Sequence, residues 1–252
     1  MKSIQKPKSD SIFKPTTFIN NFAPHLAMVQ LPSFGILSLI PHLDRYLHSQ
    51  PDHTLPYIFN TKYHLFNQPI NHVLIYAGMG APVASMSLEI AIELGVERIF
   101  IIGTCGILNP IIQSGDIIIP TGFICNEGTS SHYRSSDESF EKDNHVNQNL
   151  YDTLRKHQIP CYQGLHWTTD APFRETQDKI VQYNKMDCLS VDMESSALFA
   201  IAQFYQKKIA ALLIGSDHLS ENGWDPPQPS FRVVADRIKQ VLSLIPHLIM
   251  EI

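Results

Sequence analysis

Hydrophobic and polar positions along this chain alternate between two periods, one typical of strands and the other of helices. Short, largely apolar runs cover His72–Tyr76, Arg98–Ile102 and Ala210–Ile214, and each is followed by glycine, directly or after one residue. These runs predict buried strands that end in turns. A further strand, Asp116–Ile119, is expected to stop at Pro120, because proline cannot donate to a strand ladder.

Helical segments separate these strands. Pro82–Leu94 predicts a helix, since proline suits the first helical turn and Gly95 suits the position just past the end. Its polar residues Ser85, Glu89 and Glu93 recur every four positions and form one polar stripe. Apart from Ser87, its other faces are apolar, which indicates a mostly buried helix. The other predicted helices are Asn147–His157, Arg174–Asn184, Met193–Gln206 with Asp192 as its cap, and Phe231–Leu244. Strands alternating with helices predict an α/β sheet.

Domain organisation follows from polarity and composition. Residues 1–24 are polar and contain prolines, so we expect an N-terminal arm or a disordered tail, whereas residues 25–252 show no linker or repeat and predict one domain. Hydrophobic residues make up 44% of the 252, enough for a sizeable core. The net charge of −5 comes without a basic stripe, which argues against binding nucleic acid.

Several further classes of protein are disfavoured by what the sequence lacks. It has no apolar run near the ~20 residues that a membrane helix needs and no signal peptide, so we expect a cytoplasmic protein without a membrane partner. Its four cysteines are widely spaced, which predicts free thiols. No zinc-protease, Walker or EF-hand motif is present, and we expect no bound metal.

Glycine-rich segments follow two of the predicted strands, at the edge where open α/β sheets bind ligands. Gly78-Met79-Gly80 could bring backbone N–H groups to an anion or a sugar, or form only a tight turn. Val83 replaces the third glycine of a dinucleotide fingerprint. Gly103-Thr104-Cys105-Gly106 could cradle an anion or be a plain loop, and its thiol is expected to be buried and inert.

Two acidic residues near strand ends are candidates for chemistry. Glu194 could accept hydrogen bonds from both hydroxyls of a ribose, with Met193 packed beneath the sugar, or it could complement a helix N-terminus. Asp217, in Gly215-Ser216-Asp217-His218, could act as a general acid or cap the following turn.

Aromatic and basic residues at Trp167, Phe173 and Arg174 are candidates for binding a base. An aromatic ring can stack on a base, and a guanidinium can bind an acceptor on it. Core packing and a surface ion pair are the alternatives.

The order of the motifs is more specific than any one of them. Across Val73 to Trp224, the chain resembles the nucleoside phosphorylase family that includes uridine and bacterial purine nucleoside phosphorylases. The six motifs are Gly78–Pro82, Gly103–Gly106, Gly115–Pro120, Glu127–Tyr133, Val191–Glu194 and Gly215–His218. The resemblance implies a single three-layer α/β/α domain with a central mixed β-sheet, a homo-oligomer from dimer to hexamer, and no organic cofactor.

The resemblance also implies roles in cleaving a ribose–base bond. Glu194 would bind the ribose hydroxyls and Met193 would pack against the sugar, while Thr104, with Gly80 and Gly103, would contact the nucleophile. We therefore expect a nucleoside, with or without phosphate, as the partner.

The base would be bound by a second group of residues. Asp217 falls where purine-cleaving members carry an acid near N7 of the base, which favours purines. Phe173 lies near the base-stacking position, with Arg174 beside it.

The chain departs from the family at its phosphate-binding arginines. Their positions fall at Ile101, at Leu37 and near Pro56. An apolar residue at the first of these is typical of the family's hydrolytic members. Phosphorolysis is the family default, hydrolysis is the second hypothesis, and a non-catalytic nucleoside-binding protein is the third. The cations that could replace the arginines are Arg134, Arg174 and Lys62.

Overall fold

The computed structural model describes residues 11–47, 50–58, 61–68, 70–135, 140, 144–226 and 231–248. The strands are β1 (Phe34–Ser38), β2 (His53–Ile58), β3 (Thr61–Phe66), β4 (His72–Tyr76), β5 (Arg98–Ile107), β6 (Ile117–Asn126), β7 (Cys161–Thr169), β8 (Cys188–Asp192), β9 (Lys208–Ser220) and β10 (Gly223–Asp225). The α-helices are α1 (Pro15–Phe22), α2 (Ala81–Glu93), α3 (Asn144–Lys156), α4 (Gln177–Asn184), α5 (Ser195–Phe204) and α6 (Phe231–Leu248). Short 3₁₀ turns are η1 (Pro24–Leu26), η2 (Leu43–Tyr46), η3 (Ser130–His132) and η4 (Pro172–Arg174).

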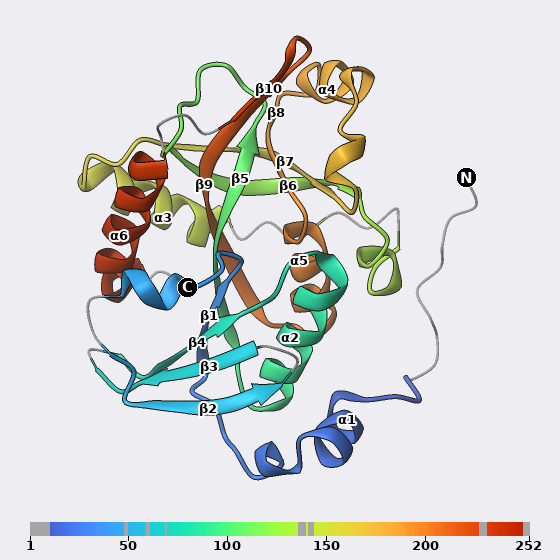
Figure 1. Cartoon of the computed structure of the whole chain (residues 1–252), viewed down its shortest axis with the longest axis vertical. Coiled ribbons are helices and arrows are strands. Elements are labelled where there is room, and N and C mark those ends of the chain that lie inside the picture. Colours follow the sequence, from blue (N-terminus) through green and yellow to red (C-terminus); the bar gives the residue numbers. More distant parts are fainter. Residues whose placement is uncertain are drawn as a thin grey trace.

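The described strands form one mixed sheet in the order β10-β9-β6-β7-β8-β5-β1-β4-β3-β2. β5 begins beside β1 and β9, both parallel to it, and ends between β9 and antiparallel β8. Because β9 also pairs with β6, and β7 joins β6 to β8, these five strands close into a ring at one end of the sheet. β5 thus carries the chain from the open sheet into the ring (Figure 1).

Helices cover both faces of the open sheet, α3 and α6 on one side and α2 and α5 on the other (Figure 1). The two-residue period of β5 divides its side chains between these layers. Ile99 and Ile101 pack with residues of α1, α2 and α5, whereas Phe100 and Ile102 pack with residues of α3 and α6. The predicted three-layer α/β/α domain with a central mixed sheet is confirmed. Among the described helices, none combines the length and apolar character needed to cross a membrane.

Several predicted strands are longer than expected. β5 runs through Gly103–Gly106, and β9 runs through Gly215–His218, because the two strands pair in parallel along this length. Leu39 and Leu213 fill the space above Gly103, so the glycine sits in a packed strand. The prediction that Pro120 stops its strand is wrong, since β6 continues to Asn126 past a register shift next to this proline.

The predicted helices are all present, with ends shifted by a few residues. The helix expected over Arg174–Asn184 begins later, as α4, after η4. α6 continues past the predicted end and contains Pro246. Six strands were not predicted: β1, β2, β3, β7, β8 and β10.

Residues 11–24, the described part of the predicted N-terminal arm or tail, contain the helix α1, which packs on the domain. α1 buries Phe18 and Ile19 in the core shared with α2 and α5, and Thr16 donates a hydrogen bond to Glu93. Pro15 starts this short helix and Ala23 ends it. Residues 1–10 of the predicted arm lie outside the described residues.

We predict that α1 contributes measurably to stability. Ile19→Ala removes a side chain that is 3% exposed, so the free energy of unfolding should fall by about 2–5 kcal/mol. Ile12→Ala is the matched control, because Ile12 is 101% exposed and its loss should change stability by less than about 0.5 kcal/mol. Urea unfolding measures both. Equal, small losses would show that the helix does not pack on the domain.

Candidate active site

Glu194 is buried at the turn between β8 and α5. Its Oε1 accepts the Gly80 N–H at 2.5 Å, and its Oε2 accepts the Met193 N–H at 3.2 Å. Gly80 has a φ of 87°, a conformation that favours glycine and lets its N–H meet the carboxylate. Burial raises the pKa of Glu194 to about 7, and the charge of Asp192 adds to the rise, while the two amide hydrogen bonds oppose it. The carboxylate therefore joins the β4–α2 turn to the β8–α5 turn.

Asp192 fixes the turn that carries Glu194. Its buried carboxylate accepts the N–H groups of Glu194 and Ser195, and it also accepts the Thr168 hydroxyl. The N-cap of α5 is Glu194, two residues after the predicted cap Asp192. Nε2 of His166 lies 3.0 Å from Oδ1 of Asp192. Burial favours a raised pKa for Asp192, but His166 and the hydrogen bonds outweigh it and lower the pKa. An ionised Asp192 thus holds the turn.

A second buried acid extends this network. Glu127 accepts the Ser196 hydroxyl with one carboxylate oxygen and the Ser130 N–H with the other, both at 2.9 Å. The Ser196 N–H in turn donates to the Thr168 hydroxyl at 3.0 Å. The Glu127–Tyr133 motif thus supports the first turn of α5 from outside the turn itself.

Asp217 lies on β9, half-buried, with both carboxylate oxygens engaged. Oδ2 accepts the Trp224 Nε1–H at 2.7 Å, and Oδ1 accepts the Ser216 hydroxyl at 2.5 Å. Gly106 of β5 pairs with Asp217 on one side and with Val191 on the other. A Cβ placed on Gly106 would lie 3.6 Å from Oδ2 of Asp217 and 3.1 Å from Val191. Asp217 and the turn that holds Glu194 are therefore carried by strands on either side of β5.

Glu175 joins Asp217 from the loop between η4 and α4. Burial raises the pKa of Glu175 to about 7, the charge of Asp217 raises it further, and Lys179 opposes both. Glu175 therefore favours its protonated form near neutral pH. The sequence analysis missed Glu175 and Trp224, because loops separated in the sequence bring them to Asp217 and no spacing marks them.

The glycine–threonine segment lies within β5 rather than in a loop. Thr104 is half-buried and pairs with Ile214, and Gly103 is enclosed by packed leucines. Burial raises the pKa of the Cys105 thiol well above its usual range, and the charges of Asp192 and Asp217 add to this. As expected, the thiol is buried, and all four cysteines are free. The predicted contact of Gly80 with the nucleophile now competes with Glu194, because that N–H is occupied.

The candidates for base binding divide into buried and exposed residues. Trp167 is fully buried and packs edge-on against Tyr183 at 4.8 Å, so it belongs to the core. Phe173 is 99% exposed on η4, beside exposed Arg174, and η4 leads directly into Glu175. Base binding by Phe173 and Arg174 remains a prediction.

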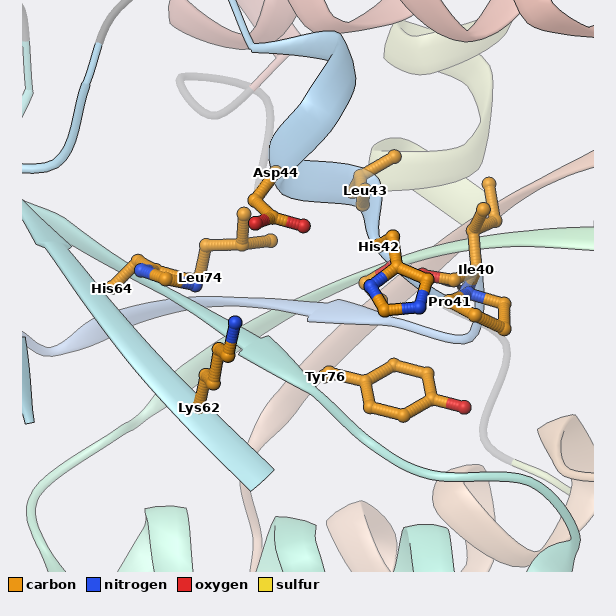
Figure 2. Close-up of a pocket in the computed structure, with 10 residues that line it drawn as sticks. Ile40, Pro41, His42, Leu43, Asp44, Lys62, His64, Leu74 and Tyr76 are labelled. Carbon is orange, nitrogen blue, oxygen red and sulfur yellow. Dashed lines mark hydrogen bonds between the residues drawn. The ribbon is translucent and has the colours of Figure 1, made fainter. Parts of the chain in front are cut away.

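The positions matched to the family's phosphate-binding arginines carry no charge. Ile101 and Leu37 pair across β5 and β1 and are buried in the same core cluster. Of the cations considered as replacements, the guanidinium of Arg134 lies over the Phe140 ring at 4.2 Å, and Arg174 is exposed. Lys62 lines a cavity beside β4 (Figure 2). Within the described ranges, no cluster of three or more His, Cys, Asp or Glu could hold a metal ion.

This fold, with acids carried on strands either side of β5, defines an α/β protein with a candidate active site beside that strand. The sequence profile of the phosphorylase superfamily matches residues 42–245, and the chain belongs to that superfamily. Solved structures agree in fold. Uridine phosphorylase from Vibrio fischeri has a TM-score of 0.78 at 19% identity, covering 91% of this chain and 96% of that one. Purine nucleoside phosphorylase from Toxoplasma gondii has a TM-score of 0.72 at 20% identity, covering 88% and 92%.

Curated relatives are similar over part of their length. The chain is 29% identical over 126 residues to guanosine phosphorylase from Halorubrum lacusprofundi, covering 50% of this chain and 52% of the relative. It is 29% identical over 145 residues to a DeoD-type purine nucleoside phosphorylase from Colwellia psychrerythraea, covering 57% and 62%. The chain thus matches between about half and three-fifths of these relatives.

We predict that Glu194 sets the acidic limb of the activity profile. Its pKa of about 7 lies above the ordinary value of 4.5, so the carboxylate forms only as pH rises towards neutrality. If the carboxylate binds substrate, kcat/KM should rise with a midpoint near pH 7. Glu194→Gln should remove this limb and lower kcat/KM by about 10- to 100-fold.

Glu97→Gln is the matched control, since the Glu97 side chain is exposed and forms a surface ion pair with Lys207. It should leave the profile unchanged. The raised pKa also means that the folded chain holds a proton that the unfolded chain releases, so the stability contributed by Glu194 falls between pH 4.5 and 7. Glu194→Gln should remove that slope in thermal unfolding. An unchanged acidic limb in Glu194→Gln would show that another group titrates.

Proposed function

We propose that this chain cleaves the N-glycosidic bond of a ribonucleoside, preferring purines, with phosphate as the attacking group. The observation that carries the proposal is the placement of Glu194 and Asp217 by strands on either side of β5, near Thr104. The named activities of the purine nucleoside and guanosine phosphorylases that the chain resembles support it.

Glu194 serves the sugar in this mechanism. As the bond to the base stretches, the ribose acquires the positive charge of an oxocarbenium ion. An ionised carboxylate accepts hydrogen bonds from two hydroxyls and stabilises a nearby positive charge. Half-buried Met193, next in the chain, offers apolar surface for the sugar. The Gly80 N–H holds the carboxylate in place before substrate binds.

Asp217 serves the leaving base. A base leaves more readily when it is protonated as the bond breaks, a contribution of about 10²–10⁴-fold. Glu175, with a pKa of about 7, holds a proton near neutral pH within electrostatic reach of Asp217, and the Trp224 N–H fixes the orientation of Oδ2 of Asp217. Asp217 falls where purine-cleaving members of the family carry an acid near N7 of the base, which supports the purine preference. Two such placed acids weigh against a non-catalytic nucleoside-binding protein.

Hydrolysis is the second candidate, and a specific observation favours it. Ile101 and Leu37 are fully packed in the core, so neither position supplies charge to a phosphate. Water needs no cationic site, and Thr104 together with the neighbouring backbone would suffice to orient it. The two reactions share the roles of Glu194 and Asp217 and differ only in the nucleophile.

We predict that Asp217→Asn separates substrates by their leaving groups. Cleavage of purine nucleosides should fall by about 10²–10⁴-fold, because the amide cannot protonate the base. A 4-nitrophenyl riboside, whose leaving group needs no proton, should be affected far less. Exposed Asp225, on β10, provides the control Asp225→Asn, which should resemble the unmodified protein. Equal losses on both substrates would assign Asp217 a structural role, and faster cleavage of uridine than of purine nucleosides would overturn the purine preference.

The nucleophile can be identified from the products. We predict that ribose 1-phosphate forms when phosphate is supplied, with a phosphate KM in the millimolar range, about −4 kcal/mol of binding, because the family's arginine positions are uncharged. Slow cleavage to free ribose should remain in phosphate-free buffer. Chromatography of the sugar products distinguishes the two. Free ribose alone at every phosphate concentration would establish hydrolysis, and saturation at micromolar phosphate would contradict weak binding.

A further inference from the structure

Trp224 reaches Asp217 because of the register of the hairpin formed by β9 and β10. In this antiparallel pair, Trp224 lies directly opposite Leu219. Opposed side chains share one face of the pair, and a diagonal neighbour two positions away is within reach of an aromatic side chain. Asp217, two positions before Leu219, is that diagonal neighbour. The 2.7 Å hydrogen bond from Nε1 of Trp224 to Oδ2 of Asp217 accords with this placement.

A bulge in β9 shapes the other side of the Asp217 carboxylate. Gly215 pairs with Cys105 of β5, and Asp217 pairs with the next residue, Gly106. Ser216 is therefore an extra residue on β9, as in a β-bulge. Neighbouring side chains of a regular strand point to opposite faces, but here the Ser216 hydroxyl donates to Oδ1 of Asp217 at 2.5 Å. The bulge thus brings a hydroxyl and a carboxylate of adjacent residues together.

Apolar packing accounts poorly for the position of Trp224. Its side chain is 60% exposed, and all three residues of β10 are exposed. A side chain in this position gains little from burial of apolar surface. Trp167, the other tryptophan of the chain, is in contrast fully buried in the core. The hydrogen bond to Asp217 is therefore the contact that explains where the Trp224 indole lies.

The two oxygens of Asp217 are bound by donors of different kinds. The indole N–H of Trp224 can donate but cannot accept, so Oδ2 can only accept while this bond lasts. The Ser216 hydroxyl can rotate, and its oxygen also lies 3.1 Å from the carbonyl oxygen of Cys105. Its single proton can therefore turn from Oδ1 to that carbonyl. Of the two carboxylate oxygens, Oδ1 is thus the one that can carry a proton without breaking the bond to the indole.

We propose that Trp224 is a positioning residue that assigns the transferable proton of Asp217 to Oδ1. Oδ2 is then the carbonyl oxygen of the protonated acid, held by the indole N–H. As the ribose–base bond breaks, its electron pair stays on the base, the Oδ1–H bond breaks and a new N–H bond forms on the base. Asp217 is left as a carboxylate, which the indole N–H stabilises by a charge-assisted hydrogen bond. The inference rests on the proposed function, in which Asp217 protonates the leaving base.

Trp224→Phe tests this role in kinetics, because phenylalanine keeps an aromatic ring and lacks the N–H. The kcat for a purine nucleoside should fall by about 10- to 100-fold, since the carboxylate loses a donor, while KM changes little. A 4-nitrophenyl riboside, whose leaving group needs no proton, should be cleaved as by the unmodified protein. Trp224→His, which keeps a ring N–H, should recover part of the lost activity. Glu221→Gln, at the exposed turn of the same hairpin, is the control and should match the unmodified protein.

Nuclear magnetic resonance locates the proton without any substrate. The chain has two tryptophans, so its indole N–H groups give two resonances, and Trp224→Phe identifies them. Asp217→Ala removes the acceptor and should move the Trp224 resonance upfield. Asp217→Asn imitates the acid protonated at Oδ1, because its amide oxygen can stay on the indole while its NH₂ group takes the place of Oδ1–H. Its Trp224 resonance should lie between those of the unmodified protein and Asp217→Ala.

These measurements separate the inference from the proposed function. An Asp217→Ala resonance that does not move, or an Asp217→Asn resonance equal to that of Asp217→Ala, would overturn the assignment of the proton to Oδ1. Equal losses by Trp224→Phe on the purine nucleoside and the riboside would refute the positioning role while the cleavage activity stands. Resonances in the expected order, in a protein that cleaves no nucleoside, would uphold Oδ1 as the proton-bearing oxygen and refute the activity alone.

Discussion

Burial of the Glu194 carboxylate between two strand-to-helix turns is the constraint on which the site depends. An acid in this position is costly unless hydrogen bonds satisfy it, and the Gly80 and Met193 N–H groups do so. The need to satisfy this carboxylate constrains both turns. Gly80 must adopt a positive φ, and the turn before α5 must be rigid, which explains the buried acid and histidine beneath it. Packing, polar satisfaction and proposed chemistry therefore meet at one side chain.

Sequence reasoning succeeded where local signals and the fold agree. The strand His72–Tyr76 was predicted with its observed ends, and the α2 helix was marked by Pro82 and Gly95. It failed where pairing with a strand distant in the sequence determines the secondary structure. Gly103–Gly106 and Gly215–His218 read as turns, but β5 and β9 pair along both segments and hold them as strands. Local glycine content cannot reveal a partner more than a hundred residues away in the chain.

The candidate site divides in the same way. Glu194 and Asp217 carry family motifs and were singled out from sequence, and the structure places them on either side of β5. Glu175, Trp224 and Tyr76 were missed, because each approaches an acid from another segment of the chain. These contacts are electrostatic and leave no motif in the sequence. The charge of Asp217 adds to the rise in the pKa of Glu175, and the charge of Glu194 adds to the rise in the pKa of Tyr76. Such coupling exists only in the folded chain.

The distribution of charge around the candidate site determines which charged species it would stabilise in the proposed reaction. Four acids, Glu194, Asp192, Asp217 and Glu175, lie around the proposed sugar and base sites. This arrangement favours a cationic sugar in the transition state and disfavours an anionic nucleophile close to the acids.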